Sequence, residues 1–193
     1  MEVALGCVYI PELCFYTRIL VIFCLALNDL FRAFSFGGND MNDAESMRLA
    51  LALAERGRGW TAPNPMVGAV IVKDGAVIGQ GWHERYGEPH AERNALASCT
   101  ADPAGATMYV TLEPCCHHGK QPPCVDAILA SGIRRVVIGS ADPNPLVAGK
   151  GVAILRSRGV EVTENVLREE CDALNRIFFH YIPTGRPFVS MKY

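Results

Sequence analysis

One histidine, one glutamate and two cysteines are spaced as in a catalytic zinc site. His90 lies two residues before Glu92, Cys115 follows Pro114, and Cys124 comes nine residues after Cys115. Catalytic zinc takes three protein ligands from histidine, cysteine or carboxylate and leaves a fourth position for water. The histidine and the two cysteines supply that set, and zinc lowers the pKa of water toward about 7, which provides hydroxide at neutral pH. Glu92 is then placed to move protons between this water and a leaving amine.

A structural zinc site is the alternative. Structural zinc normally has four protein ligands, and Cys116, His117 or His118 could supply the fourth. A pair of cysteines can also simply fill buried apolar space. The combination of H-A-E with two cysteines that each follow a proline favours catalysis, because H-x-E with P-C-x-x-C is the signature of zinc deaminases.

The composition excludes several classes of protein. The 193 residues include 18 Lys and Arg against 20 Asp and Glu, and half of all residues are hydrophobic. A chain of this length buries roughly 70% of its unfolded surface, so it needs no disulfides, and its hydrophobic content excludes a disordered chain. A net charge of −2 provides no basic field for a phosphate backbone, so we expect no nucleic-acid partner. Thiols clustered beside histidines indicate a reducing compartment, the cytoplasm.

The first forty residues differ from the rest of the chain. They contain five of the eight Phe residues and three cysteines. Their apolar run, Ile19 to Leu27, is nine residues long, whereas a membrane-spanning helix needs about 20, so we expect no membrane segment. A secretory signal would suit a run of this length, but Glu2 and Glu12 precede it. We interpret residues 1–40 as an atypical extension and Met41 as the natural first residue of the domain.

From Met41 onward, the expected helices and strands alternate. Asn42 and Glu45 predict a capped helix start, and apolar runs at 66–72 and 77–82 predict a hairpin. The elements expected after the hairpin are a helix at 92–98, a strand at 107–112, a helix at 125–130, a strand at 135–138, a helix at 152–158, a strand at 160–162 and a helical stripe at 167–183. This order predicts an α/β fold whose mostly parallel sheet has helices on both faces.

A longer series of motifs resembles the riboflavin-pathway pyrimidine deaminases. From residue 111 the chain has T-L-E-P-C-C-H-H-G-K-Q-P-P-C, in which eight residues rather than two separate the outer cysteines. Further matches are P-N-P-M-V-G-A-V from residue 63, G-E-P-H-A-E from residue 87 and D-P-N-P from residue 142. The similarity extends from about Met41 to the end of the chain and does not include residues 1–40.

The resemblance implies a three-layer α/β/α cytidine-deaminase-like fold, with a mixed sheet of about five strands, and a hydrolytic reaction. The expected substrate is 2,5-diamino-6-ribosylamino-4(3H)-pyrimidinone 5′-phosphate, which would lose an amino group as ammonia. It implies zinc bound by His90, Cys115 and Cys124, with Glu92 as proton donor. Cys116, where the family more often has serine, is not an expected ligand. Six further residues are expected to form the substrate pocket: Asn64, His83, His117, Lys120, Asp142 and Asn144.

Three of these pocket residues can also be interpreted from local chemistry. Asn64 and Asn144 each lie between two prolines, which restrict the backbone on both sides. Each carboxamide would therefore have a fixed direction, as the polar edge of a pyrimidine requires, although an ordinary Pro-Asn turn is the alternative. Lys120 is a point charge beside the cysteine loop that could contact a phosphate or a ring oxygen, or could be solvated.

The domains expected from the resemblance are the extension 1–40, a deaminase domain at 41–183 and the start of a reductase domain or a tail at 184–193. Many family members continue into a reductase that uses NADPH, so we expect reductase activity from a separate or missing domain. The sequence is compatible with a homo-oligomer and does not determine the oligomeric state. One alternative function is deamination of another nucleotide or base, of the cytidine, dCMP or tRNA adenosine type. The other is an inactive, zinc-stabilised partner of a reductase, which Glu92 argues against.

Overall fold

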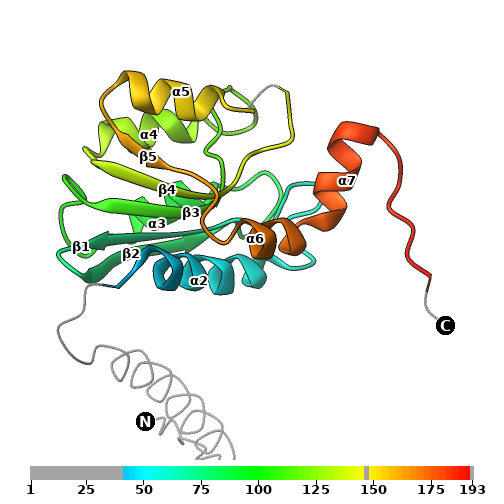
Figure 1. Ribbon diagram of the computed structural model, residues 1–193, viewed down its shortest axis with the longest axis horizontal. Coiled ribbons are helices and arrows are strands. Elements are labelled where there is room, and N and C mark those ends of the chain that lie inside the picture. Colours follow the sequence, from blue (N-terminus) through cyan, green and yellow to red (C-terminus); the bar gives the residue numbers. More distant parts are fainter. Residues whose placement is uncertain (1–40, 146–147, 192–193) are drawn as a thin grey trace, which may run out of the picture. The chain divides into compact units, whose positions relative to one another are not determined.

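The computed structural model describes residues 41–145 and 148–191, and the predicted extension at 1–40 lies outside these residues. Within them, five strands form one sheet in the order β2-β1-β3-β4-β5 (Figure 1). The strands are β1 Gly68–Lys73, β2 Ala76–Trp82, β3 Thr107–Leu112, β4 Arg135–Ser140 and β5 Glu161–Thr163. The α-helices are α2 Asp43–Ala54, α3 Ala91–Ala97, α4 Cys124–Ala130, α5 Lys150–Ser157, α6 Arg168–Leu174 and α7 Arg176–Thr184. None of the described helices combines the length and the apolar character needed to cross a bilayer.

The sheet is mixed, as predicted. Strand β1 pairs antiparallel with both β2 and β3, whereas β3, β4 and β5 pair in parallel. Strand β1 therefore runs against the other four strands. The predicted hairpin joins β1 to β2 through Asp74 and Gly75, which both have positive φ angles, as a tight two-residue hairpin turn requires.

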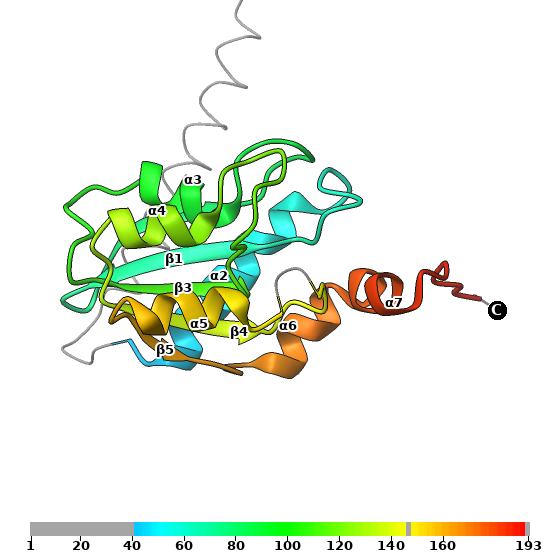
Figure 2. The same cartoon turned by 90° about the horizontal axis from the view of Figure 1, so that it is seen from above.

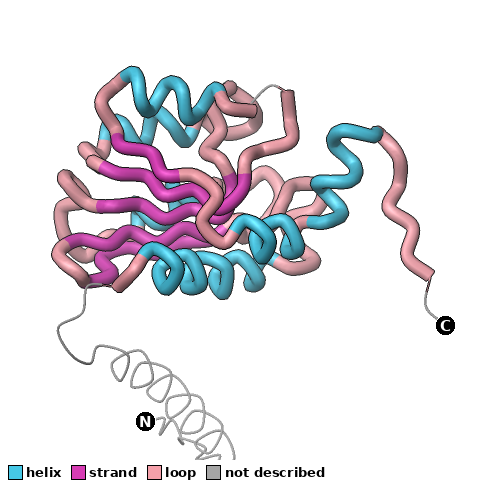
Figure 3. Tube along the Cα trace, in the orientation of Figure 1, coloured by secondary structure: helices cyan, strands magenta, loops and turns pink. Residues whose placement is uncertain are grey.

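Helices cover both faces of the sheet (Figures 1, 2 and 3). Helices α3, α4 and α5 share one apolar core with alternate strand residues: Ala69, Ile71, Met108, Val110, Val136 and Ile138. Helices α2 and α6 cover the other face, where the intervening residues point: Val70, Val72, Tyr109 and Val137. Because both faces of the sheet are covered, the sequences of the central strands are nearly continuous apolar runs. The predicted three-layer α/β/α arrangement is confirmed.

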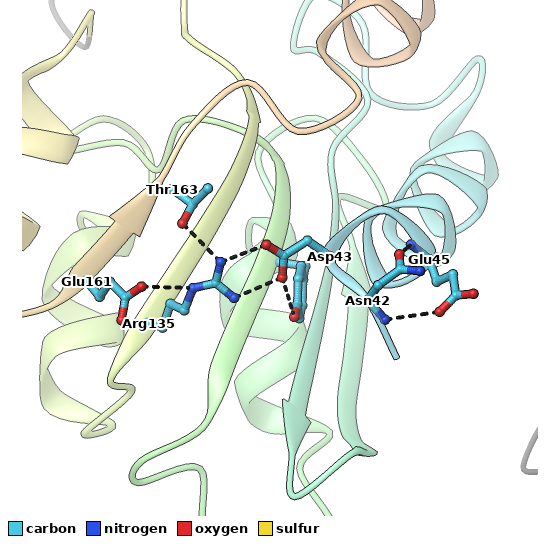
Figure 4. Close-up of polar contacts among 7 residues, drawn as sticks. Asn42, Asp43, Glu45, Arg135, Glu161 and Thr163 are labelled. Carbon is cyan, nitrogen blue, oxygen red and sulfur yellow. Dashed lines mark hydrogen bonds and ion pairs between the residues drawn. The ribbon is translucent and has the colours of Figure 1, made fainter. Parts of the chain in front are cut away.

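Helix α2 begins with the predicted cap. The Asn42 side chain accepts a hydrogen bond from the Glu45 backbone N–H (2.9 Å), and the Glu45 carboxylate accepts one from the Asn42 N–H (3.0 Å) (Figure 4). This reciprocal pair satisfies two N–H groups that have no partner within the helix. The start of α2 is therefore specified by local sequence.

The predicted helical stripe at 167–183 is wrong in one respect: it forms two helices rather than one. The break falls at Asn175, which has φ −116° and ψ 28° and lies between α6 and α7. The Asn175 side chain is hydrogen-bonded to the backbone of Met66. The apolar spacing that predicts one continuous helix gives no sign of this distant contact. Pro183 lies inside α7, which ends one residue later, before Gly185.

Candidate active site

Three potential metal ligands converge where α3 and α4 begin. His90 is the N-cap residue of α3, Cys115 lies in the loop after β3, and Cys124 is the first residue of α4. The two Sγ atoms lie 3.5 and 3.4 Å from His90 Nδ1, and all three donor atoms lie within 4.8 Å of one another. Tetrahedral zinc, with bonds of about 2.3 Å to sulfur and about 2.0 Å to nitrogen, holds such atoms about 3.5 Å apart. The donor set therefore fits zinc.

The pKa shifts of His90, Cys115 and Cys124 bear on whether these residues can bind metal. A hydrogen bond between the two thiols lowers the pKa of Cys115 and raises the pKa of Cys124, so one sulfur is readily ionised. The Cys124 backbone N–H also donates to Cys115 Sγ (3.4 Å). The hydrogen bond with Cys115 raises the pKa of His90. A divalent cation would replace this shared proton, since thiolates are the forms of cysteine that bind metal.

Glu92 is a buried carboxyl group beside the metal-ligand group. It is the second residue of α3, its exposed fraction is 3%, and it lines the same cavity as His90. Burial raises its pKa to about 7, and the neighbouring Cys115 adds to this shift. A carboxyl group with a pKa in this range exchanges protons readily near neutral pH.

A cavity of about 260 Å³ opens beside these residues. This volume is close to the lower end of small-ligand pockets, about 300 Å³. The structure places nine of the ten predicted site residues along its wall: Asn64, His83, His90, Glu92, Cys115, His117, Lys120, Asp142 and Asn144. The tenth, Cys124, is completely buried and contacts His90.

Asn64 and His83 form a hydrogen-bonded pair in the cavity wall. His83 Nδ1 lies 3.1 Å from the Pro89 carbonyl oxygen, which can only accept, so Nδ1 carries the proton. Nε2 then accepts from the Asn64 Nδ2 amide at 3.1 Å. Burial lowers the pKa of His83, which favours the neutral ring. Because the amide nitrogen of Asn64 is engaged, its carbonyl oxygen is the atom that can accept from a ligand.

The loop after β4 supplies Asp142 and Asn144. The Asn144 backbone N–H donates to Asp142 Oδ1 (2.8 Å), which closes a short turn around Pro143. Burial raises the pKa of Asp142 to about 6. Both proline-flanked asparagines predicted from the sequence, Asn64 and Asn144, therefore lie at the same cavity.

The long loop between the cysteines carries Lys120 and His117. Lys120 Nζ lies 3.9 Å from the centre of the Tyr86 ring, a cation–π contact that holds the ammonium group at the cavity wall. His117 Nδ1 is buried and has no hydrogen-bond partner among the described residues. Gln121, in the same loop, donates to the Gly87 carbonyl oxygen (2.9 Å).

Several residues at the site were not predicted from the sequence. Tyr86 and Phe178 line the cavity, and no local pattern marks either of them as a site residue. Glu113, two residues before Cys115, is buried and accepts hydrogen bonds from the N–H groups of Gly149 (3.0 Å) and Val152 (3.4 Å). It thereby ties the cysteine loop to the start of α5. Its position in the L-E-P-C motif was the available signal.

The sequence of this chain matches a known class of zinc-binding enzymes. Residues 40–140 match the family model described as the cytidine and deoxycytidylate deaminase zinc-binding region. The chain is also 48% identical over 147 residues, 76% of its length, to the whole of a diaminohydroxyphosphoribosylamino-pyrimidine deaminase from Buchnera aphidicola. The chain belongs to the pyrimidine deaminase family of riboflavin biosynthesis, and the resemblance found in the sequence is confirmed.

Longer relatives agree with this assignment. The riboflavin biosynthesis protein RibD of Actinobacillus pleuropneumoniae is 62% identical over 153 residues, which are 79% of this chain and 41% of that protein. The crystal structure of a Thermotoga maritima deaminase/reductase superposes with a TM-score of 0.73 at 51% identity, covering 76% of this chain and 42% of that one. The chain spans about two fifths of the length of these two relatives. The family description and the donor set together confirm zinc as the cofactor.

Proposed function

We propose that this chain hydrolytically deaminates 2,5-diamino-6-ribosylamino-4(3H)-pyrimidinone 5′-phosphate and releases ammonia. The observation that carries the proposal is the buried Glu92 carboxyl group beside the donor group His90, Cys115 and Cys124 at one ligand-sized cavity. The name of the Buchnera relative, which is aligned over its whole length, supports this reaction.

In this proposal His90, Cys115 and Cys124 hold the zinc ion. When bound, zinc supplies a water nucleophile at neutral pH, and three protein ligands leave room for it. Among the described residues, the group of converging donors does not include Cys116, His117 or His118. This favours a catalytic site over the structural alternative, which would need a fourth protein ligand.

Glu92 would act as the general acid and base. It would take a proton from the attacking water and pass it to the ring nitrogen as the C–O bond forms and the ring C=N bond becomes single. It would then move the hydroxyl proton of the adduct to the amino nitrogen, so that the C–N bond breaks as the carbonyl forms. The departing nitrogen then leaves as ammonia. The burial of Glu92 supports this role, because a carboxyl group shielded from bulk water exchanges protons with the substrate rather than with solvent.

The remaining predicted residues would bind the substrate. Asn64, oriented by neutral His83, would accept from the pyrimidine edge, and Asp142 with Asn144 would face another part of the ring. Lys120 and His117, in the cysteine loop, would meet the phosphate or a ring oxygen. A charged ammonium group suits a phosphorylated substrate better than a free nucleobase.

We also propose where the next reaction takes place and in which compartment the enzyme works. We expect the following reduction, which the name of the Thermotoga protein includes, to come from a separate domain. Two reduced cysteines beside each other at the site favour the cytoplasm as compartment.

Deamination of a cytidine-type nucleotide is the second candidate function, because the description of the family model names cytidine and deoxycytidylate deaminases.

Ammonia release from the diaminopyrimidine phosphate tests the proposal. The full chain, loaded with zinc, should release one ammonia per substrate consumed. A chelator should abolish the activity, and added zinc should restore it. Zinc-loaded protein that releases no ammonia from this compound would refute the proposal and leave the cytidine-type and inactive-partner alternatives.

A further inference from the structure

Asn175 connects the C-terminal helices to the segment that carries Asn64. Its Oδ1 accepts from the Met66 N–H (2.8 Å), and its Nδ2 donates to the Met66 carbonyl oxygen (2.7 Å). One side-chain amide thus satisfies both backbone groups of a residue 109 positions away in the chain. The exposed fraction of Asn175 is 6%, so water does not compete readily for these bonds.

The position of Met66 determines the position of Asn64. Only Pro65 separates the two residues, and proline fixes its own φ and restricts the residue before it. The Asn64 N–H donates to the Thr61 carbonyl oxygen (2.8 Å), which holds the other side of the turn. With both ends held, the Asn64 side chain reaches His83 and the cavity in one orientation.

The same residue leads into α7, which contributes to the cavity wall. Asn175 lies at the break between α6 and α7, and Figure 2 shows the two helices following one another at one end of the sheet. Phe178, three residues further along α7, lines the cavity. A continuous helix through Asn175 would redirect both the amide and the aromatic ring.

We infer that Asn175 is a positioning residue for the substrate pocket, which holds Asn64 in place through the backbone of Met66. The kinetic part of this inference rests on the proposed deamination, whereas the placement of Asn64 does not. Asn175 acts through Asn64, so its effect on activity must depend on the presence of the Asn64 side chain.

A double-mutant cycle in the full chain tests this dependence. Asn175→Ala should lower kcat/KM about tenfold or more, mainly through KM, because misplacing a binding group by about 1 Å can cost about 100-fold. Zinc content should not change. In the Asn64→Ala background, Asn175→Ala should lower kcat/KM less than about twofold. Equal factors in both backgrounds would overturn the inference, as would an Asn64→Ala variant with normal kinetics.

Asp172→Ala is the matched control. The Asp172 side chain holds α6 to β4 by accepting from Ser140 Oγ (2.6 Å), whereas its backbone carbonyl oxygen, which alanine retains, accepts from the Asn175 N–H (3.1 Å). This variant weakens the attachment of the same helix but keeps both hydrogen bonds between Asn175 and Met66, so its kcat/KM should stay within about twofold of the parent chain. If Asp172→Ala raises KM as much as Asn175→Ala, general loosening of α6 explains the effect and the inference is wrong.

The nitrogen NMR signals of the His83 ring provide a readout that does not depend on activity. His83 Nε2 accepts from Asn64, so its ¹⁵N shift should move in Asn175→Ala in the same direction as in Asn64→Ala, and not in Asp172→Ala. An unchanged shift in Asn175→Ala would refute the inference even if the chain deaminates a different substrate. The near-isosteric Asn175→Asp, which loses the donor to Met66, should move the shift similarly. If neither Asn175 variant yields folded, zinc-loaded protein, Asn175 is required for folding and the inference is wrong.

Discussion

At the scale of single residues, the site depends on where polar groups are buried. His90 and Glu92 lie two residues apart at the start of α3, both line the cavity, and the histidine contacts both thiols. Burial raises the pKa of Glu92 and lowers that of His83. The same physical cause thus favours the protonated form of a carboxyl group and the neutral form of an imidazole ring within one pocket.

Replacing the Glu92 carboxyl group tests its assignment. Glu92→Gln keeps the shape and the burial but cannot transfer protons, so kcat should fall by about 10² to 10⁴. Zinc content, measured by mass spectrometry, should remain at one per chain. Glu84→Gln, at an exposed position outside the cavity wall, is the control and should be neutral. Near-normal turnover of Glu92→Gln at full zinc occupancy would contradict the role.

The choice of cysteine ligands can be tested by metal content alone. Cys115→Ala and Cys124→Ala should each lose zinc, because two remaining ligands hold the ion poorly. Cys116→Ser should keep it, since Cys116 is not among the converging donors of the described residues. Loss of zinc from Cys116→Ser as complete as from Cys115→Ala would show that the ligand choice is wrong.

The sequence indicated the residues with strong local signals and missed those without any. The H-A-E and P-C motifs, and asparagines between prolines, are visible within a few residues of sequence. Phe178 lines the cavity from α7, and Asn175 is hydrogen-bonded to Met66 from the junction of α6 and α7; both come more than 100 residues after Asn64. No local pattern encodes such a contact, because it depends on how α6 and α7 pack against the rest of the fold.

At the scale of elements, a charged cluster joins α2 to the sheet. Arg135, at the start of β4, donates from Nη1 and Nη2 to the two carboxylate oxygens of Asp43 (2.8 and 2.7 Å) (Figure 4). It also donates to Thr163 Oγ1 (3.0 Å), and the Tyr109 hydroxyl donates to Asp43 Oδ1 (3.1 Å). Residues from α2, β3, β4 and β5 therefore meet at one point, beside the cap of α2.

Asp43→Asn should destabilise the chain in a pH-dependent manner. The hydrogen bonds from Arg135 hold the pKa of Asp43 below its usual value, so the ion pair stabilises the fold above about pH 4 and loses its effect as the pH falls through the lowered pKa. The Asp43 side chain is 34% exposed, so we expect a loss of about 1 kcal/mol at pH 7, measured by urea unfolding.

The control for this prediction is Glu55→Gln. Glu55 pairs with Arg58 at 2.6 Å, but both side chains are more than half exposed, so its loss should be near zero. The difference between Asp43→Asn and the parent chain should shrink steadily below pH 4. A difference in the free energy of unfolding that stays constant down to pH 2 would mean that the charge of the Asp43 carboxylate does not contribute to stability.

Most elements could be predicted because local pattern and tertiary fold agree. The strands are short apolar runs bounded by glycine or charged residues, and Asn42 with Glu45 marks the start of α2. The exception is the break at Asn175. The apolar spacing of Leu167, Cys171 and Leu174 continues smoothly into Phe178, whereas the residue at the break, Asn175, is hydrogen-bonded to the distant Met66 backbone.

At the scale of the whole molecule, we propose that the deaminase domain begins at Met41. A chain that starts there retains the capping box and the Asp43 to Arg135 pair. It should fold, bind one zinc ion and deaminate as well as the full chain. Loss of soluble, folded protein on removing residues 1–40 would contradict this boundary, as would recovery of mature enzyme outside the cytoplasm.

The measurement that tests the account most directly is the ratio of kcat/KM for the diaminopyrimidine phosphate and for dCMP, both determined with the zinc-loaded full chain. We predict a ratio of about 10³ or more, because a site whose buried polar groups are matched to one substrate leaves them unpaired with another. Asn64, His83, Asp142 and Asn144 are the groups that would discriminate. A ratio near one, or a preference for dCMP, would contradict the proposed substrate while leaving the zinc site intact.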